Sequence, residues 1–135
     1  MKFINENKEA ILCSNSESIK LLDLNSGNCE FYPGHTDIIL TLDKFGEEEG
    51  WILSGAKDSQ MRLWKYNSKA QPFEKIKCVA VFKGHNKNIC SVHFAPKKGN
   101  QFVSSSQDNT IKVWDIKDLI AEYDGTGEVQ TIKQA

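Results

Sequence analysis

The sequence predicts an all-β fold built from repeated units of short antiparallel strands. Three observations lead to this prediction. Segments of the chain align with one another without gaps, apolar residues alternate with polar ones along them, and a few landmark residues recur at fixed spacing. The aligned segments are residues 10–23, 52–65 and 102–115. A chain of 135 residues is long enough to bury a real core, so the repeats can pack together.

Each aligned segment has the pattern of a β-hairpin. It begins with an apolar run, continues through a polar turn, and ends in a strand whose apolar residues lie two apart. Period-two alternation around such turns predicts strands and not helices. The apolar pairs on one face of the closing strand are Ile19 and Leu21, Met61 and Leu63, and Ile111 and Val113.

Landmark residues extend the repeat on the N-terminal side of the second and third segments. Gly34-His35 and Gly84-His85 precede these segments, and the glycine and the following Trp are 30 residues apart in both. A period of about 40 to 50 residues with four strands is typical of the blades of a β-propeller. The further strand-like runs that complete four strands per repeat are 29–32, 38–45, 78–82 and 89–95.

These landmarks resemble the WD-repeat family of β-propellers. Trp114-Asp115 matches the dipeptide of the family, whereas Trp64-Lys65 retains the Trp and lacks the Asp. The resemblance implies about three four-stranded antiparallel blades, which form part of a propeller. In each blade the Gly-His turn would lead into the innermost strand, and the Trp would lie on the third. The expected blades are a truncated, degenerate first blade at 1–32, a second at 33–82 and a third at 83–135.

The two ends of this array depart from the full pattern. In the first repeat Leu22 stands where Trp is expected and Ser16 where Asp is expected, so this blade must rely on apolar packing. The chain is expected to begin just before the second strand of that blade, and residues 132–135 are expected to form the outer strand of the last one. We therefore expect a piece of a larger propeller, completed by the remainder of the ring or by self-association.

Two sets of polar residues could be interpreted as catalytic. Ser, His and Asp together suggest a hydrolase, because a triad is recognised by its geometry and not by its order. The set occurs twice at identical spacing, however, and neither Ser lies in a G-x-S-x-G elbow. The WD-repeat resemblance implies instead that each set is a structural tetrad, a hydrogen-bond chain from Trp to Ser to His to Asp. The two tetrads are His35, Ser54, Asp58 and Trp64, and His85, Ser104, Asp108 and Trp114.

Composition and charge favour a globular chain that neither spans a membrane nor is secreted. Hydrophobic residues make up 39% of the sequence and charged residues 26%. No apolar run approaches the roughly 20 residues that cross a bilayer, and the polar N-terminus does not predict a signal peptide. The net charge of −1 conceals an asymmetry, because residues 51–100 contain 10 basic and 2 acidic side chains.

The sequence predicts no metal site, no cofactor and no small-molecule substrate. The four cysteines, at positions 13, 29, 78 and 90, include no closely spaced pair of the kind that a zinc site requires, so reduced thiols are expected. Phosphate-binding loops, H-E-x-x-H and dinucleotide fingerprints are absent from the sequence. We therefore predict that the chain is not an enzyme.

The basic residues in the middle of the chain concentrate in and around two loops. The blade layout of the WD-repeat family places the loops at 66–77 and 96–101 on the same face of the array. Two interpretations remain open: a surface that contacts RNA phosphate or an acidic partner, and solvated lysines that cluster by chance. The lysines of this basic patch are Lys65, Lys69, Lys75, Lys77, Lys97 and Lys98.

A closer resemblance concerns segments 14–16, 34–43, 50–51 and 56–58, which are similar to WD-repeat proteins of the small-subunit processome. It implies a nuclear, nucleolar scaffold that assembles with other WD-repeat proteins in the UTP-B subcomplex, during early processing of pre-ribosomal RNA. The alternative is a WD-repeat adaptor of another assembly, such as one that recruits substrates to a ubiquitin ligase. Both functions are non-enzymatic, and a fold alone does not decide between them.

Overall fold

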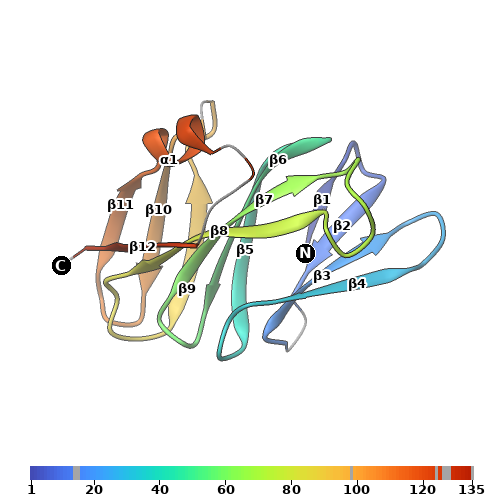
Figure 1. Cartoon of the computed structure of the whole chain (residues 1–135). Coiled ribbons are helices and arrows are strands. Elements are labelled where there is room, and N and C mark those ends of the chain that lie inside the picture. The colour runs from blue at the N-terminus through green and yellow to red at the C-terminus, as the bar shows by residue number, and fades with distance from the viewer. Residues whose placement is uncertain (14–15, 98, 124, 126–128, 135) are drawn as a thin grey trace.

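The computed structural model describes residues 1–13, 16–97, 99–123, 125 and 129–134. Within these ranges the chain forms twelve β-strands and one short helix, and the strands make three sheets that lie side by side (Figure 1). The predicted all-β fold class is confirmed. In the same ranges, no helix is long and apolar enough to cross a membrane.

The first sheet has four antiparallel strands in sequence order. They are β1 (Lys2–Ile4), β2 (Glu9–Leu12), β3 (Ser18–Asp23) and β4 (Cys29–Pro33). Ile19 and Leu21 of β3 both point to the buried face, as the alternation predicts. The chain was expected to begin just before the second strand of this sheet, without a first strand; this is wrong, because residues 2–4 pair with residues 9–11 as that first strand. Its two apolar residues are too few to produce a recognisable alternating pattern.

The second sheet lies in the centre and contains five strands. They are β5 (Ile39–Gly46), β6 (Glu49–Ala56), β7 (Met61–Asn67), β8 (Ile76–Lys83) and β12 (Gln130–Lys133). β6 is buried from Gly50 to Ala56, because both faces of this sheet are covered by its neighbours. β5 to β8 are antiparallel, whereas β12 pairs with β8 in parallel.

The third sheet corrects the prediction for the C-terminus. Its strands, in the part of the chain that the structure describes, are β9 (Ile89–Phe94), β10 (Gln101–Ser106) and β11 (Ile111–Asp115). Residues 132–135 were expected to form the outer strand of this sheet, but residues 130–133 join the second sheet as β12, and residue 135 lies outside the described residues. The helix α1 (Lys117–Glu122) redirects the chain, because Leu119 and Ile120 pack against the apolar core and lead it away from β11.

Two apolar cores hold the three sheets together. The core between the first and second sheets includes Tyr32 and Trp64, and the core between the second and third includes Phe82, Phe102 and Trp114. The ring centroids of Phe82 and Phe102 are 4.9 Å apart, with an angle of 85° between the ring planes. This edge-to-face contact is a favourable arrangement of aromatic rings. The central sheet therefore contributes one face to each core.

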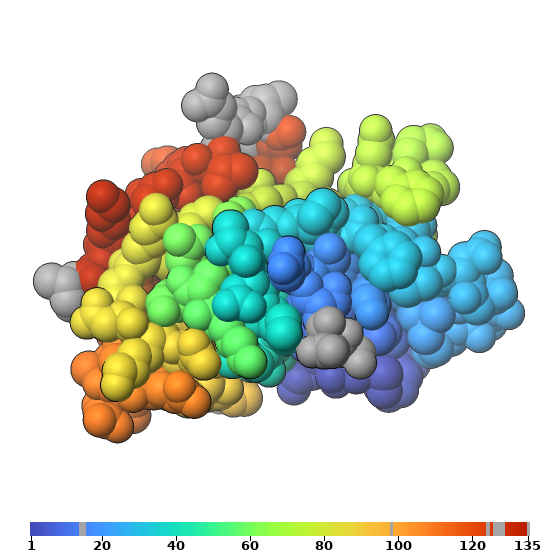
Figure 2. Space-filling view, turned by 90° about the horizontal axis from the view of Figure 1, so that it is seen from below, coloured from blue at the N-terminus to red at the C-terminus, as the bar shows by residue number. Residues whose placement is uncertain are grey.

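Antiparallel pairing gathers the turns at two ends of the sheets. The turns before β5, β7, β9 and β11 lie at one end, where Figure 2 shows cyan, green, yellow and orange segments on the same face. The turns before β6, β8 and β10 lie at the other end. The equivalent turns at 57–60 and 107–110 share an unusual backbone, since Ser59 and Asn109 have positive φ angles of 69° and 68°. The sequence repeat is thus also a repeat of local geometry.

Candidate functional site

The first tetrad forms a continuous chain of hydrogen bonds across the second sheet. The Nε1–H of Trp64 on β7 donates to Oγ of Ser54 on β6, at 2.9 Å. The Ser54 Oγ lies 2.6 Å from Nε2 of His35. The Nδ1 of His35 is 2.9 Å from Oδ2 of Asp58. Every group has a partner when His35 donates from Nδ1 to the carboxylate and accepts the hydroxyl hydrogen at Nε2, so we assign this tautomer.

The second tetrad repeats this geometry in the third sheet. Trp114 Nε1–H donates to Ser104 Oγ at 2.9 Å, and the same Oγ lies 2.8 Å from Nε2 of His85. The Nδ1 of His85 is 3.0 Å from Oδ2 of Asp108. Thr110 adds a contact, because its hydroxyl donates to Oδ1 of Asp108 at 2.5 Å.

Hydrogen bonds keep both aspartates of the tetrads ionised. Burial alone would raise the pKa of Asp58, but the hydrogen bonds from His35 and from the backbone N–H of Gln60 outweigh it and lower that pKa. The hydrogen bond from the Thr110 hydroxyl is the largest cause that lowers the pKa of Asp108. A carboxylate that accepts several hydrogen bonds is stabilised in its charged form.

Close contacts at the turn of each tetrad explain why a glycine precedes the His. A Cβ added to Gly34 would lie 2.5 Å from Cη2 of Trp64, which is closer than two carbon atoms can approach without a shift. A Cβ added to Gly84 would meet the backbone oxygen of Gln134 at 2.4 Å and Cη2 of Trp114 at 3.3 Å. The indole of Trp64 therefore leaves no room for a side chain at Gly34, whereas at Gly84 the backbone of Gln134 is the main obstacle.

The two tetrad serines are poorly placed to attack a substrate. Ser54 and Ser104 are fully buried, and each hydroxyl oxygen already contacts an indole N–H and an imidazole. A catalytic serine must reach the carbon atom that it attacks. This geometry is suited to tying neighbouring strands together and not to nucleophilic attack.

The first sheet retains one part of the tetrad pattern. Ser16, at the position equivalent to Asp58, accepts a hydrogen bond from the backbone N–H of Ser18 at 3.1 Å and so preserves the turn. Leu22, at the position equivalent to Trp64, has no polar group to donate. The sheet packs against its neighbour through the apolar side chains expected for a degenerate repeat, but this interface also contains a buried carboxylate, Glu9, which accepts a hydrogen bond from Tyr66 of the second sheet.

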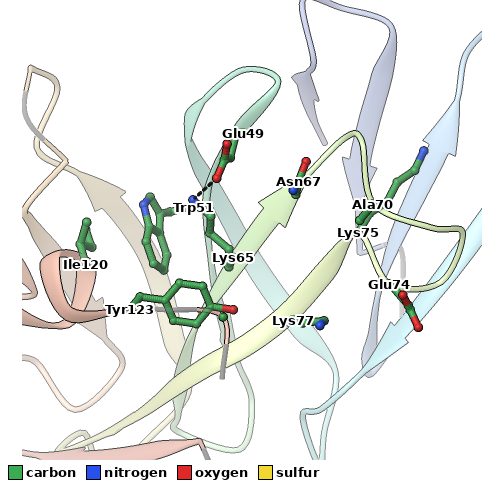
Figure 3. A pocket seen from close by; sticks show the side chains of 11 residues that line it. Glu49, Trp51, Lys65, Asn67, Ala70, Glu74, Lys75, Lys77, Ile120 and Tyr123 are labelled. Atoms are coloured by element: carbon green, nitrogen blue, oxygen red, sulfur yellow. Dashed lines mark ion pairs between the residues drawn. The ribbon is translucent and has the colours of Figure 1, made fainter. Parts of the chain in front are cut away.

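Three of the six lysines of the basic patch meet at one cavity. Lys65, Lys75 and Lys77 line a cavity of about 410 Å³ at one end of the second sheet, opposite Tyr123 and the end of α1 (Figure 3). Lys65 lies on β7, Lys77 lies on β8, and Lys75 is the residue before β8. Adjacent antiparallel strands thus bring together lysines that are 10 to 12 residues apart in the sequence.

The other three lysines of the patch are not among the residues that line this cavity. Lys69 is exposed in the connection between β7 and β8, and Lys97 is exposed in the connection between β9 and β10. Lys98 lies outside the described residues. Contact of the basic patch with a ligand remains a prediction.

Two of the cavity lysines have partners within the chain. The Nζ of Lys65 is 3.2 Å from Oε1 of Glu49 and 4.7 Å from the ring centroid of Trp51. The Nζ of Lys75 is 3.3 Å from Oε2 of Glu9, a carboxylate of the first sheet. Lys75 therefore also has a structural role, because it neutralises a buried charge.

The sequence did not predict a buried polar cluster that lies between the first two sheets. Glu9 is 4% exposed and accepts hydrogen bonds from the hydroxyl of Tyr66 and, at 3.1 Å, from Nδ2 of Asn5. Burial, and then the hydrogen bond to Glu9, raise the pKa of Tyr66. Glu9 follows the polar stretch 5–8, so no signal in the sequence distinguishes it from an exposed glutamate.

The described residues contain no group of three or more His, Cys, Asp and Glu side chains that could hold a metal ion. The four cysteines form no disulfide, and Cys90 is the most exposed of them. Burial is the main cause that raises the pKa of the thiols of Cys13 and Cys78. A raised pKa makes a thiol less reactive, since the thiolate is the nucleophile.

Comparison with known proteins identifies relatives of this chain. Transducin beta-like protein 3 of Homo sapiens is 36% identical over 110 residues, which are 81% of this chain. The ribosome biogenesis protein WDR12 homolog of Drosophila persimilis is 35% identical over 98 residues, or 71% of this chain. Coronin-like protein crn1 of Schizosaccharomyces pombe is 33% identical over 93 residues, or 67% of this chain.

These relatives are much longer than the part that they share with this chain. The aligned region is 13% of the length of human transducin beta-like protein 3, 21% of the WDR12 homolog and 16% of the coronin-like protein. The family described as WD domain, G-beta repeat matches residues 27–65 and 76–115, and these two matches contain Trp64 and Trp114. This chain belongs to the WD-repeat family.

Proposed function

We propose that this chain is a non-catalytic WD-repeat scaffold that brings proteins together in ribosome biogenesis. The observation that carries the proposal is the duplicated tetrad, whose potentially reactive side chains are buried inside two sheets. Rigid repeats of this kind present extended surfaces for partners. The name of one relative, a ribosome biogenesis protein, supports the process in which such a scaffold would act.

The finer part of this proposal is a role in the small-subunit processome. The resemblance of segments 34–43, 50–51 and 56–58 to WD-repeat proteins of that assembly supports it. On this proposal the chain acts in the nucleolus, beside other WD-repeat proteins of a UTP-B-like complex.

Two exposed apolar faces support an assembly larger than this chain. On the third sheet Val103 lies opposite Val113, next to Ile111, and all three side chains are exposed. On the first sheet Phe3 and Phe31 are exposed. Exposed apolar patches of this kind mark interaction surfaces. We propose that further blades, or a second copy of the chain, cover them.

A contact between the basic patch and RNA phosphate is a separate part of the proposal. Lys69 and Lys97 are exposed, so replacing both with Glu tests such a contact without disturbing the fold. We expect weaker crosslinking to RNA and a smaller dependence of binding on salt. Lys75 is unsuitable for this test, because its replacement would also remove the partner of buried Glu9.

Affinity purification of the tagged chain from the cells that express it tests the scaffold function. We expect pre-ribosomal RNA and WD-repeat proteins of the UTP-B subcomplex to co-purify with the chain. Recovery of cullin-type ligase subunits instead would favour the adaptor alternative and contradict the proposal. An unrelated WD-repeat protein, tagged and purified in the same way, controls for proteins that bind any propeller.

A further inference from the structure

We propose that the cavity at the end of the second sheet binds an acidic segment of a partner protein, with a carboxylate seated beside Lys65 and Lys77. This inference deepens the proposed scaffold function and rests on it, since it requires that the partner is a protein.

The floor consists of two rows of side chains that cross three adjacent strands. In the first row Trp51 on β6 lies opposite Lys65 on β7, which in turn lies opposite Lys77 on β8. The second row lies two residues nearer the end of the sheet, and its Lys75, just before β8, directs its Nζ to Glu9 of the first sheet. All the side chains of both rows line the cavity. The second row contains Glu49, Asn67 and Lys75.

The first row places two lysines, Lys65 and Lys77, directly opposite one another on neighbouring strands. Like charges directly opposite one another on neighbouring strands destabilise a sheet. Glu49 offsets the charge of Lys65, with its Oε1 at 3.2 Å from Nζ. For Lys77, the described part of the chain supplies no ion-pair partner. An external carboxylate beside Lys77 would remove the remaining repulsion between the two lysines.

The wall opposite Lys77 is aromatic and apolar. Tyr123 packs edge to face against Trp51, with ring centroids 5.5 Å apart and 73° between the ring planes. Ile120 lines the cavity on the same side (Figure 3). Figure 3 shows Trp51 and Tyr123 on one side of the cavity and Lys77 on the other. An apolar side chain next to the carboxylate of a ligand would therefore contact the half-buried side chains of Tyr123 and Ile120 on this wall.

A second cavity extends the first into an elongated groove. It has a volume of about 300 Å³ and shares four lining residues with the first, among them Trp51 and Lys65. It continues to Phe45 and Gly99, at the junction with the third sheet. An extended segment of polypeptide fits such a groove and can place alternate side chains in the two cavities.

The charges of the cavity favour a protein over a nucleic acid. Glu49 and Glu74 lie among the lining residues and would repel a continuous phosphate backbone, whereas a single carboxylate can lie away from them. Trp51 offers no open ring for a base to stack on, because it is 7% exposed and Lys65 lies over its ring.

Binding of a labelled peptide to the full chain tests this inference. The probe is a short fluorescein-labelled peptide of Asp and Glu residues around one Phe, and fluorescence anisotropy measures its affinity. We expect Lys77→Glu to weaken binding by about tenfold and Lys77→Arg to retain it. The matched control is Lys57→Glu, which makes the same charge change at an exposed position at the other end of the sheets and should leave the affinity unchanged. Circular dichroism verifies that each variant is folded.

The inference is wrong if the peptide does not bind, or if Lys57→Glu loses as much affinity as Lys77→Glu. It is also wrong if oligouridylate binds more tightly than the peptide, displaces it and depends on Lys77 for binding. If the peptide fails to bind while the chain still co-purifies with its partners from cells, the assignment of this cavity is wrong and the scaffold function stands. A loss of co-purification in both Lys77→Glu and Lys57→Glu would equally contradict a specific role of the cavity.

Discussion

Tyr66 on β7 donates its phenolic hydrogen to the carboxylate of Glu9 on β2, and this buried contact joins the first and second sheets. Both side chains are buried. Lys75 supplies a positive charge to the other carboxylate oxygen, at 3.3 Å. Because a buried carboxylate is costly unless it is paired and hydrogen-bonded, these donors are needed for the interface between the sheets to form.

Replacing Tyr66 with Phe should therefore destabilise the chain. The ring and its packing are retained, but Glu9 loses a hydrogen-bond donor inside the interface, which costs about 1–3 kcal/mol of unfolding free energy. Urea unfolding followed by tryptophan fluorescence measures the change. The control is Glu17→Gln, a conservative change at an exposed position, which should have little effect. Equal stability of Tyr66→Phe and the unchanged chain would contradict this role of the pair.

The sequence was sufficient to predict the features that depend on local pairing. Alternation identified most of the strands, and the repeated spacing of Gly, His, Ser, Asp and Trp identified the residues that the structure joins in each tetrad. These residues come from consecutive turns and strands, so the distance between them along the chain determines whether they meet in space.

The features that the sequence did not predict depend on contacts between distant segments. β12 could have paired with the edge of β11 or of β8, and its own four residues contain no information that decides between the two edges. The helix α1 decides it, through packing that only the assembled core provides. Likewise, Glu9 resembles an exposed residue until Tyr66 of another sheet covers it.

The tetrad serines provide a second test, in which Ser104 is replaced by Ala. The change removes the acceptor of the Trp114 indole N–H and the partner of His85 Nε2, and it leaves both polar groups buried. We expect the free energy of unfolding to fall by about 1–3 kcal/mol for each unpaired group. Ser68→Ala, in an outer connection, is the matched control. A loss of some enzymatic activity with unchanged stability would instead revive the catalytic interpretation.

The ionised aspartates of the tetrads predict a decrease in stability in acid. The pKa of Asp58 is lower in the folded chain than its usual value of 3.8, so the unfolded chain binds more protons near that pH. Its contribution to stability is complete above the usual value and is lost as the pH falls toward the lowered one. Asp108 acts in the same direction.

The measurement for this effect is the unfolding free energy as a function of pH in the chain and in Asp58→Asn. The variant cannot ionise at this position, so its stability should decrease less steeply below about pH 4. It should also be less stable near neutral pH, because it lacks the charge-assisted hydrogen bond with His35. Parallel pH profiles of the two proteins would show that Asp58 does not contribute.

The apolar face of the third sheet predicts that the chain associates with further blades or with itself. Ile111 is 73% exposed and Val113 is 57% exposed, and in the described residues no strand pairs with the outer edge of β11. Burial of this face against another sheet would be favourable, as it is at the two interfaces within the chain.

Ile111→Glu places a charge on that face and should reduce association without loss of stability, because the side chain is mostly exposed in the isolated chain. Sedimentation velocity over a range of concentrations measures the effect, with Phe73→Glu, an exposed aromatic residue in a distant connection, as the control. A chain that stays monomeric at every concentration and unfolds cooperatively would contradict this prediction, since its apolar face would then be stable in water without a partner.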